Sequence, residues 1–281
     1  MKPLLAATLE KLEDVTFPKI CSPKLDGIRC LVMNGVAYSR TLKPIPNKNV
    51  QSALKYYSNT DGEIIIGSPT NPLAFRNTTS IVMSDEKPLP VLQSGGWHLK
   101  YYVFDDFSDP NKPYKDRMGQ NTIESVLIRN ITELKAYEKK CVDAGYEGIM
   151  LRNPDSPYKF GRSTVREAGL LKFKRFHDDE AICTGYEQRK ENNNVAVKGP
   201  TGSKKPTKQA NIVLLDTIGA LNMEYQGQPL SVGSGLDDAE RARLWKIRDK
   251  LAGKIVKFKY QKTEGIPRFP VYLGIRDARD M

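Results

Sequence analysis

The chain has 281 residues, which is enough for two domains of ordinary size. Its 44 Lys and Arg residues outnumber its 33 Asp and Glu residues, giving a net charge of +11 that is spread over both halves. No stretch approaches the ~18 apolar residues needed to cross a bilayer, so the sequence excludes membrane-spanning helices. The charge favours a polyanionic partner such as nucleic acid, although a merely solvated basic surface would show the same balance.

The four cysteines show no metal-site pattern. None forms a Cys-x-x-Cys pair, and neither histidine is spaced to complete a zinc site. The cysteines are Cys21, Cys30, Cys141 and Cys183. Unpaired thiols are typical of a reducing compartment, and the apolar run Pro3–Ala7 is too short for a secretory signal. We therefore expect a cytoplasmic protein, located in the host cytoplasm if its source is a virus.

The first predicted elements form a hairpin. Ile28–Met33 and Val36–Ser39 are apolar and β-prone, and Asn34-Gly35 between them is a strong signal for a two-residue turn. This arrangement puts Lys24 in the turn that leads into the first strand. Asn49–Tyr57 follows as a short predicted helix.

Buried strands and one long helix follow. Asp61-Gly62 is predicted to be a turn at the entrance of the first of these strands. Thr122–Ala144 has apolar residues at helical spacing. Lys172 and Lys174 fall on one face of the last strand because side chains alternate. The predicted strands are Glu63–Ile66, Tyr101–Phe107, Gly148–Leu151 and Gly169–Phe176.

After residue 176 the pattern changes to short β-prone runs with turn-rich joints. The runs are Ala181–Tyr186, Ile212–Asp216 and Lys254–Tyr260. A single helix is predicted at Asp237–Leu251, and Gln188–Ala210 is predicted to be a mobile, lysine-rich loop. About 100 residues of this kind suit a small five-stranded barrel of the OB type. We expect an α+β protein with an antiparallel-sheet domain at 1–176 and an OB-fold domain at 177–281.

The most informative motif is Lys24-Leu25-Asp26-Gly27-Ile28-Arg29, which places an amine close to a carboxylate and a guanidinium. A free lysine amine can act as a nucleophile once its proton is removed. On its own such a turn is common on surfaces, but six further motifs follow it in order. They are Ser39-Arg40, Asp61–Glu63, Val103–Asp105, Tyr146–Met150, Leu171–Lys174 and Arg268–Asp277.

This ordered series resembles the covalent nucleotidyltransferases, and most closely the minimal, phage-type ATP-dependent DNA ligases. The resemblance covers the chain from about Lys19 onward. It implies a nucleotidyltransferase (adenylation) domain followed by an OB-fold domain, with ATP as cosubstrate and Mg²⁺, or Mn²⁺ in its place, as the metal. The implied activity is the sealing of nicks in duplex DNA through a lysyl-AMP intermediate and an adenylated 5′-phosphate. We expect a monomer that binds nicked duplex DNA and no membrane.

The resemblance also implies roles for residues of the first domain. Lys24 is the implied nucleophile. A free lysine has a pKa of about 10.4 and is protonated at neutral pH, so its amine must lose a proton before it can attack. The cations that the resemblance places near Lys24 are Arg29, Lys172 and Lys174, and the two lysines also contact the α-phosphate. The residues implied to hold the nucleotide or its metal are Ser22 at the adenine edge, Phe104 on the base, Glu63 at the ribose or metal, and Glu147 at the metal.

Further roles concern the second domain and DNA. Arg268 and Arg276 belong to the motif that closes over the triphosphate in the first step only, which requires domain closure and reopening. Arg40 is implied to grip the 5′-phosphate of the nick, because guanidinium groups suit phosphate. Within the lysine-rich loop, the residues that we expect to follow the DNA backbone are Lys204, Lys205 and Lys208.

Two alternatives stay open. An RNA ligase or an mRNA-capping guanylyltransferase shares the lysine and both domains, although the glycine-rich turn Ser231–Leu236 favours a DNA ligase. A non-catalytic nucleic-acid-binding module would use only the basic cleft and the barrel. The complete set of motif lysines and glutamates argues against such a module, because a binding protein has no need of that cluster.

Overall fold

The computed structural model describes residues 2–85, 87–89, 98–117, 123–199, 202–204, 206, 208–261 and 267–276. The side chains of residues 198, 199 and 202–204 lie outside this description. The chain forms two compact units, one built from the residues up to Lys174 and the other from most of the chain after Arg175. No helix among the described residues is long and apolar enough to cross a membrane.

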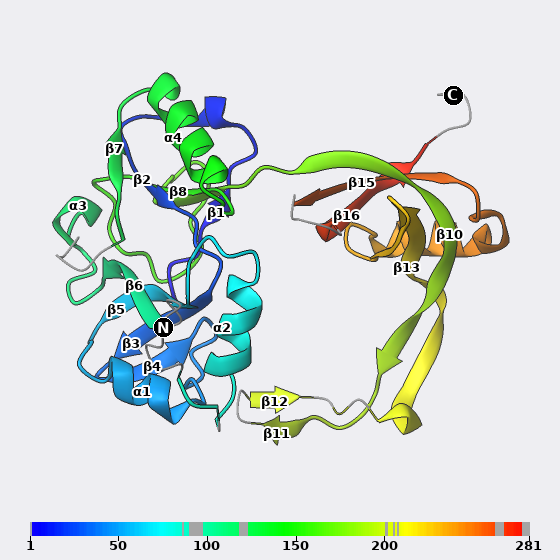
Figure 1. Ribbon diagram of the computed structural model, residues 1–281, viewed down its shortest axis with the longest axis horizontal. Helices are drawn as coiled ribbons and strands as arrows, with labels where there is room; N and C mark the ends of the chain where they lie inside the picture. The colour runs from blue at the N-terminus through cyan, green and yellow to red at the C-terminus, as the bar shows by residue number, and fades with distance from the viewer. Residues whose placement is uncertain are drawn as a thin grey trace. The chain divides into compact units, whose positions relative to one another are not determined.

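The first unit contains a four-stranded antiparallel sheet with strand order β4-β3-β5-β6 (Figure 1). Its strands are β3 (Ile28–Met33), β4 (Val36–Ser39), β5 (Thr60–Ile66) and β6 (Leu99–Asp106). Asn34 and Gly35 join β3 to β4 with φ angles of 50° and 74°, the left-handed geometry of a primed hairpin turn. The predicted hairpin is therefore confirmed.

Two helices pack against this sheet. They are α1 (Lys48–Leu54) and α2 (Ala74–Val82). Asn47 caps α1, since its side chain accepts hydrogen bonds from the backbone N–H groups of Asn49 and Val50. The helices bury Val50 and Val82 against the sheet, in a cluster that also holds Val32.

The prediction of a turn at Asp61-Gly62 is wrong, because both residues lie inside β5. Gly62 is required there by close packing, since a Cβ atom would come within 2.5 Å of the Tyr101 ring. Asp61 is fully buried and ion-paired with Arg29, which is how a carboxylate is accommodated in the middle of a buried strand.

A second, mixed sheet completes the first unit, with strand order β1-β9-β8-β2-β7. Only the β1–β9 pair among its described pairings is parallel. Its strands are β1 (Ala7–Thr8), β2 (Lys19–Pro23), β7 (Val126–Ile128), β8 (Ile149–Arg152) and β9 (Leu170–Phe173). The helix α4 (Ile131–Asp143) covers this sheet and buries Leu134 with Ile149 and Leu151.

The predicted helix Thr122–Ala144 is wrong in its first part. Residues Val126–Ile128 form β7, which pairs with β2, and the helix starts only at Ile131. Asn130 sets this start because its side chain accepts a hydrogen bond from Glu133 N. Further short helices include η1 (Leu12–Asp14), α3 (Tyr114–Arg117) and, in the second unit, η2 (Gln209–Asn211).

The second unit is a five-stranded antiparallel sheet with order β14-β13-β10-β15-β16. Its strands are β10 (His177–Asn192), β13 (Ile212–Tyr225), β14 (Gln228–Val232), β15 (Ile255–Gln261) and β16 (Arg268–Ile275). A parallel bridge between Ser234 and Val271 and a 2.9 Å hydrogen bond from Tyr272 N to Ser234 O join its two edges. The sheet therefore closes into a barrel, as the sequence predicts.

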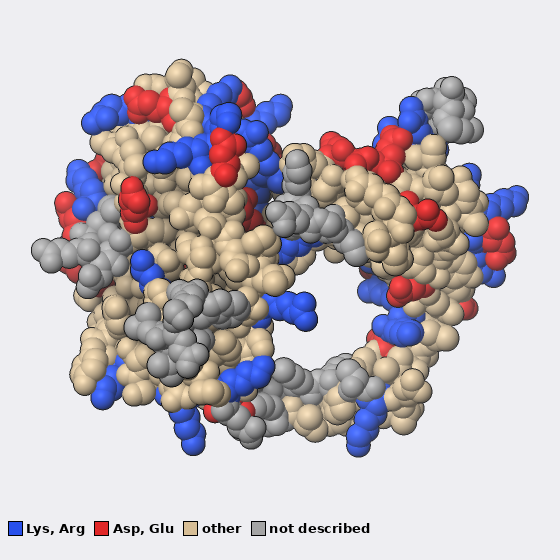
Figure 2. All heavy atoms as spheres, in the orientation of Figure 1, with Lys and Arg blue, Asp and Glu red and all other residues tan. Residues whose placement is uncertain are grey.

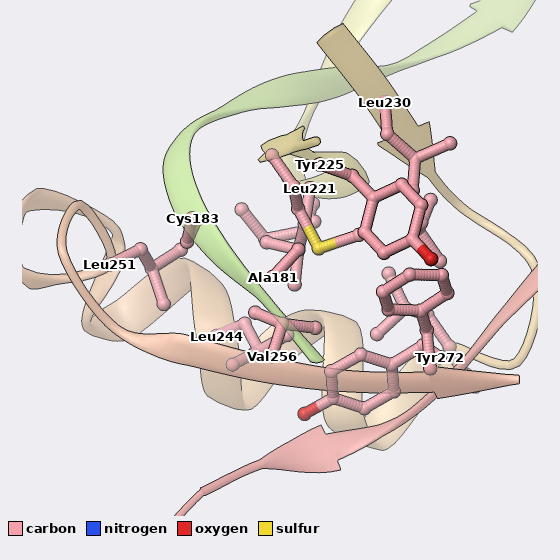
Figure 3. Close-up of a cluster of buried hydrophobic side chains, with 14 residues drawn as sticks. Ala181, Cys183, Leu221, Tyr225, Leu230, Leu244, Leu251, Val256 and Tyr272 are labelled. Atoms are coloured by element: carbon pink, nitrogen blue, oxygen red, sulfur yellow. The ribbon is translucent and has the colours of Figure 1, made fainter. Parts of the chain in front are cut away.

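The barrel encloses its own core. Figure 3 shows side chains from β10, β13, β15 and α5 (Asp238–Lys246) pointing toward one another, among them Leu221, Leu244 and Val256. The predicted helix Asp237–Leu251 is too long, since α5 ends at Lys246 and a separate turn, η3 (Arg248–Lys250), follows.

Two strands of the barrel are much longer than the predicted runs. β10 has 16 residues and β13 has 14, and their pairing extends outward as far as Asn192 opposite Ile212. Beyond that point β11 (Val197–Gly199) pairs with β12 (Gly202–Lys204). The prediction of a loop at Gln188–Ala210 is therefore wrong for Gln188–Asn192, Val197–Gly199 and Gly202–Lys204, which are paired strands.

Candidate active site

Lys24 lies in the link between β2 and β3, which belong to different sheets of the first unit. Its backbone N–H donates to Gly148 O at 2.8 Å. Three residues later, Gly27 N donates to the Glu63 carboxylate at 3.2 Å. A Cβ atom on Gly27 would come within 2.3 Å of Ile64 O, so only glycine fits this close approach. These hydrogen bonds hold the link at both ends, so the backbone position from which the Lys24 side chain extends is fixed.

The Lys24 amine is held by a carboxylate that it shares with a second lysine. Lys24 Nζ donates to Glu147 Oε2, and Lys174 Nζ donates to Glu147 Oε1. The three side chains are 19%, 9% and 21% exposed for Lys24, Glu147 and Lys174, so they are largely shielded but reachable from solvent. One carboxylate between two ammonium groups leaves the cluster with a net positive charge.

Burial and mutual repulsion shape the ionisation of this cluster. Burial, reinforced by the charges of Lys174 and Lys24, lowers the pKa of Lys172. Burial and Lys24 likewise lower the pKa of Lys174, although Glu147 opposes them. Burial would raise the pKa of Glu147, but the two lysines together outweigh it and the net shift is downward. The carboxylate thus stays ionised, while Lys172 and Lys174 release a proton more readily than free lysines do.

A cavity of about 220 Å³ opens beside Lys24, and its walls come entirely from the first unit. Both sheets contribute to it. Six of its lining side chains are basic, and Glu63 is the one acidic member among them. Such a balance suits an anionic ligand. The lining residues are Leu5, Ala6, Ser22, Pro23, Lys24, Leu25, Arg29, Arg40, Glu63, Phe104, Met150, Arg152, Arg162, Leu170 and Lys172.

Glu63 has an environment unlike that of Glu147. Burial raises the pKa of Glu63 to about 7, against the opposing pull of Arg29 and Lys24. Its carboxylate already accepts the N–H of Gly27. Near neutral pH this group can therefore donate a hydrogen bond as well as accept one.

Phe104 lies at the cavity wall next to two guanidinium groups. The guanidinium carbon of Arg29 is 4.7 Å from the ring centroid, and that of Arg152 is 5.7 Å away. Arg152 is in turn held by Asp105, which accepts its Nη1 at 2.5 Å and also pairs with Arg117. Phe104 thus packs beside two guanidinium groups that buried carboxylates hold in place.

The structure brings most of the predicted residues of the first unit together. Glu147 and Lys174 join the cavity through their ion pairs with Lys24. The predicted residues that line the cavity are Ser22, Lys24, Arg29, Arg40, Glu63, Phe104 and Lys172. Arg29 is more constrained than the sequence indicated, because Asp61 holds its guanidinium at two points.

The remaining predicted residues belong to the second unit. Arg268 begins β16 and Arg276 follows its last residue, where Arg276 Nη1 donates to Glu180 at 2.8 Å. Lys208 is exposed. Lys204 ends β12 but its side chain lies outside the described atoms, and Lys205 lies outside the described residues altogether.

The described side chains near the cavity do not form a complete metal site by themselves. Within the described part of the chain, no three His, Cys, Asp or Glu residues gather closely enough to hold an ion by themselves. Glu63 and Glu147 offer oxygen ligands near the cavity, which is the chemistry that Mg²⁺ prefers, and Mg²⁺ commonly keeps several water ligands. These residues fit a metal that is held partly by a bound phosphate.

Some lining residues were not anticipated from the sequence. Arg152 lies two residues after the motif that ends at Met150, so its position beside a motif was an available signal, whereas Arg162 adjoins none of the motifs. Leu5 and Ala6 gave no such signal, because they reach the cavity only through pairing with residues far along the chain.

Comparisons with known proteins agree with this architecture. Residues 3–174 match the family model described as ATP dependent DNA ligase domain, and residues 213–276 match that described as DNA ligase OB-like domain. Among curated relatives, the DNA ligase of Enterobacteria phage T4 is 28% identical over 144 residues, covering 48% of this chain and 24% of the relative. The DNA ligase of African swine fever virus (strain Badajoz 1971 Vero-adapted) is 29% identical over 108 residues, covering 33% of this chain and 26% of the relative. The matched part thus spans about a quarter of the length of these relatives.

Solved structures match along nearly the whole chain. The Chlorella virus DNA ligase-adenylate is 36% identical with a TM-score of 0.54, over 98% of this chain and 99% of that one. A Lig E DNA ligase, described as a minimal scaffold for DNA binding, is 22% identical with a TM-score of 0.70, over 98% of this chain and 100% of that one, and supports the fold. The predicted fold class, an α+β adenylation domain followed by an OB-like domain, is confirmed. The chain belongs to the ATP-dependent DNA ligase family.

Proposed function

We propose that this protein is an ATP-dependent DNA ligase that seals nicks in duplex DNA, with Lys24 as its nucleophile. The observation that carries the proposal is the position of the Lys24 amine. It lies at a cavity lined by six basic side chains, and it is oriented by Glu147, which also holds Lys174. A partly buried amine oriented among cations suits attack on a phosphate.

The first step forms a bond between Lys24 Nζ and the α-phosphorus of ATP. The Lys24 ammonium first releases a proton to solvent and becomes the neutral nucleophile. As the new bond forms, the bond from that phosphorus to the oxygen of the leaving pyrophosphate breaks, and the nitrogen releases a second proton to solvent. In this proposal Lys172, which lines the cavity, and Lys174, which pairs with Glu147, neutralise charge that develops on the phosphoryl oxygens. AMP then passes to the 5′-phosphate of the nick, and the 3′-hydroxyl displaces AMP to form the phosphodiester bond.

The remaining first-unit residues bind the nucleotide in this proposal. Phe104 stacks on the base, Ser22 faces the adenine edge, and Glu63 with Arg29 holds the ribose side. Mg²⁺, when bound through Glu63 or Glu147 and the phosphates, would neutralise phosphate charge.

The second unit and the DNA contacts complete the proposal. Residues 1–176 and 177–281 act as adenylation and OB-fold domains of a monomer. Arg268 and Arg276 serve the first step by orienting the departing pyrophosphate. Arg40, which is exposed at the cavity mouth, holds the 5′-phosphate of the nick. The backbone-binding lysines are Lys204, Lys205 and Lys208.

The decisive experiment follows label from ATP into the protein. With magnesium, α-labelled ATP should give an acid-labile, alkali-stable adduct on the wild-type chain, and γ-labelled ATP should give none. Lys24→Ala should take up no α-label and seal no nick, while still binding nicked duplex DNA. Lys115→Ala removes an exposed lysine that pairs with Asp155 and serves as the control that keeps the label. Uptake of the α-label by Lys24→Ala would show that Lys24 is not the nucleophile and would contradict the proposal.

The same assay separates the alternatives. Labelling by GTP in preference to ATP would indicate a capping guanylyltransferase. Sealing of nicked RNA in preference to nicked DNA would indicate an RNA ligase. Binding of nicked duplex without any labelling would indicate a non-catalytic module.

A further inference from the structure

The segment Leu4–Leu9, here called the N-terminal strap, forms one wall of the cavity. Leu5 and Ala6 are lining residues. Leu5 N donates to Gly161 O at 2.8 Å, and Leu5 O accepts from Ser163 N at 2.8 Å. The strap is thus held in place as if it were an additional strand beside a segment far along the chain.

The strap also contacts two of the cations in the cavity. Ala6 O accepts a hydrogen bond from Arg162 Nη1 at 2.8 Å. Thr8 pairs with Lys172 in the parallel β1–β9 ladder, and Leu9 N donates to Lys172 O at 3.0 Å. A shift of the strap would therefore shift basic groups that line the cavity.

A closed ring of hydrogen bonds fastens the start of the strap to Arg29. Arg29 Nη2 donates to Leu4 O at 2.9 Å, and its Nε and Nη2 donate to the two Asp61 oxygens at 2.5 Å each. Tyr158 completes the ring, because its hydroxyl donates to Asp61 at 2.6 Å and accepts from Leu4 N at 3.2 Å. Leu4, Asp61 and Tyr158 are all buried, so water does not compete for these bonds.

Within this ring the Tyr158 hydroxyl bonds directly to Leu4, which lies 154 residues earlier in the sequence. Its aromatic ring packs independently, with centroids 5.2 Å from Phe107 and 5.3 Å from Phe160. Packing and hydrogen bonding can therefore be separated by removing the hydroxyl alone.

We infer that Tyr158 and the N-terminal strap are positioning elements of the nucleotide site. The hydroxyl fixes the strap, and through Asp61 it fixes the orientation of Arg29 at the cavity wall. This inference rests on the proposed function, in which Arg29 contacts the bound nucleotide. Tyr158 itself acts through Asp61 and Leu4 and touches no substrate.

Tyr158→Phe tests the inference, with Tyr101→Phe as the matched control. Tyr101 is also a buried tyrosine of the first unit, and its hydroxyl donates to Cys30 O at 3.1 Å. In single-turnover adenylation, Tyr158→Phe should raise the ATP concentration for half-maximal rate about tenfold, the factor expected for one or two lost net hydrogen bonds. The maximal rate should change less than about twofold. Tyr101→Phe should leave both values close to those of the wild type.

Hydrogen exchange without nucleotide provides a readout that is independent of activity. The amides of the strap should exchange faster in Tyr158→Phe than in the wild type, and they should stay protected in Tyr101→Phe. Strap protection that is unchanged in Tyr158→Phe, or equal ATP dependence in the two variants, would overturn the inference. A wild-type chain that takes no label from ATP would instead remove the proposed function, and the exchange data would still decide whether Tyr158 holds the strap.

Discussion

Lys19 is a buried lysine in β2 that has no part in the proposed chemistry. It is 3% exposed, and its amine donates to Thr16 Oγ1 at 3.3 Å. Burial lowers the pKa of Lys19, with a small opposing effect from Cys21. Because the charged form is disfavoured in the folded state, Lys19 destabilises the fold at pH values where it is protonated in both states.

Lys19→Met should therefore stabilise the protein in a pH-dependent way. At pH 7 we expect a gain of about 1 kcal/mol in the free energy of unfolding, because the desolvation cost disappears. The wild-type stability should rise as the pH increases from the lowered folded pKa toward the unfolded value, so the gain should shrink by pH 10. Urea unfolding at both pH values measures this, with the exposed Lys115→Met as control. A gain that is equal at both pH values would assign the effect to packing alone.

At the residue scale, the sequence predicted which side chains meet but not what each is bonded to. Glu147 and Lys174 were expected near Lys24 because the family resemblance assigns both to the nucleotide site. The bridging of both lysines by one carboxylate depends on the register of β8 against β9, in which Ile149 lies opposite Phe173. Register comes from long-range packing, which a linear motif does not contain.

At the element scale, β16 carries the two arginines that we assign to the first step. Arg276 is oriented within its own unit, since Glu180 of β10 accepts its Nη1 at 2.8 Å. Glu180 stands opposite Lys257 of β15 in the ladder, so the carboxylate lies among basic side chains of neighbouring strands. Arg276 is thus paired with a carboxylate of its own unit, which holds its guanidinium in a defined orientation.

Arg268→Ala and Arg276→Ala should separate the two halves of the reaction. Removal of a group that stabilises developing charge commonly costs about 10²-fold in rate. We expect a loss of that order in adenylation of Lys24, with sealing of a pre-adenylated nick reduced less than about threefold. Arg248→Ala, which alters an arginine stacked on Trp245 in the same unit, is the control. Comparable losses on both substrates would mean that β16 does not act in the first step alone.

Elements defined by local chemistry were predicted well, and those defined by distant pairing were not. The Asn34-Gly35 turn requires left-handed φ angles that these residues adopt easily, so the hairpin follows from the sequence. Residues Val126–Ile128 look helical by spacing but pair with β2. The outer part of β10, Gln188–Asn192, is polar in composition, and its pairing with the apolar start of β13 at Ile212–Leu215 makes it a strand.

At the scale of the whole molecule, the two-unit architecture and the basic character were both predictable from sequence. Figure 2 shows basic side chains distributed among acidic ones over the face of both units, and not gathered in one tail. The part played by the N-terminal strap in the cavity was not predictable. Its contacts join residues that are far apart in the sequence of the first unit, such as Leu4 and Tyr158. The strap itself contains no charged residue that would indicate a site.

The charge distribution leads to a test of how the protein holds DNA. Replacing Lys204, Lys205 and Lys208 by Ala should weaken binding to nicked duplex and flatten its dependence on salt. Each lost phosphate contact lowers the slope of log affinity against log salt by about 0.9, so the full set predicts a decrease of about 2.7. Adenylation of Lys24 should be unchanged, and the loss should be similar for different sequences because backbone contacts carry no base information.

The matched control removes the same charge from α4, with Lys135, Lys139 and Lys140 replaced by Ala. Both triple variants lower the net charge equally, so an effect of overall charge would flatten the two slopes alike. A flattened slope in the Lys204, Lys205 and Lys208 variant alone would identify this segment as a contact with the DNA backbone. If neither slope changes, the segment is solvated when DNA is bound, and the grip must come from Arg40 and the other basic residues of the cavity, where single substitutions should then reduce the slope.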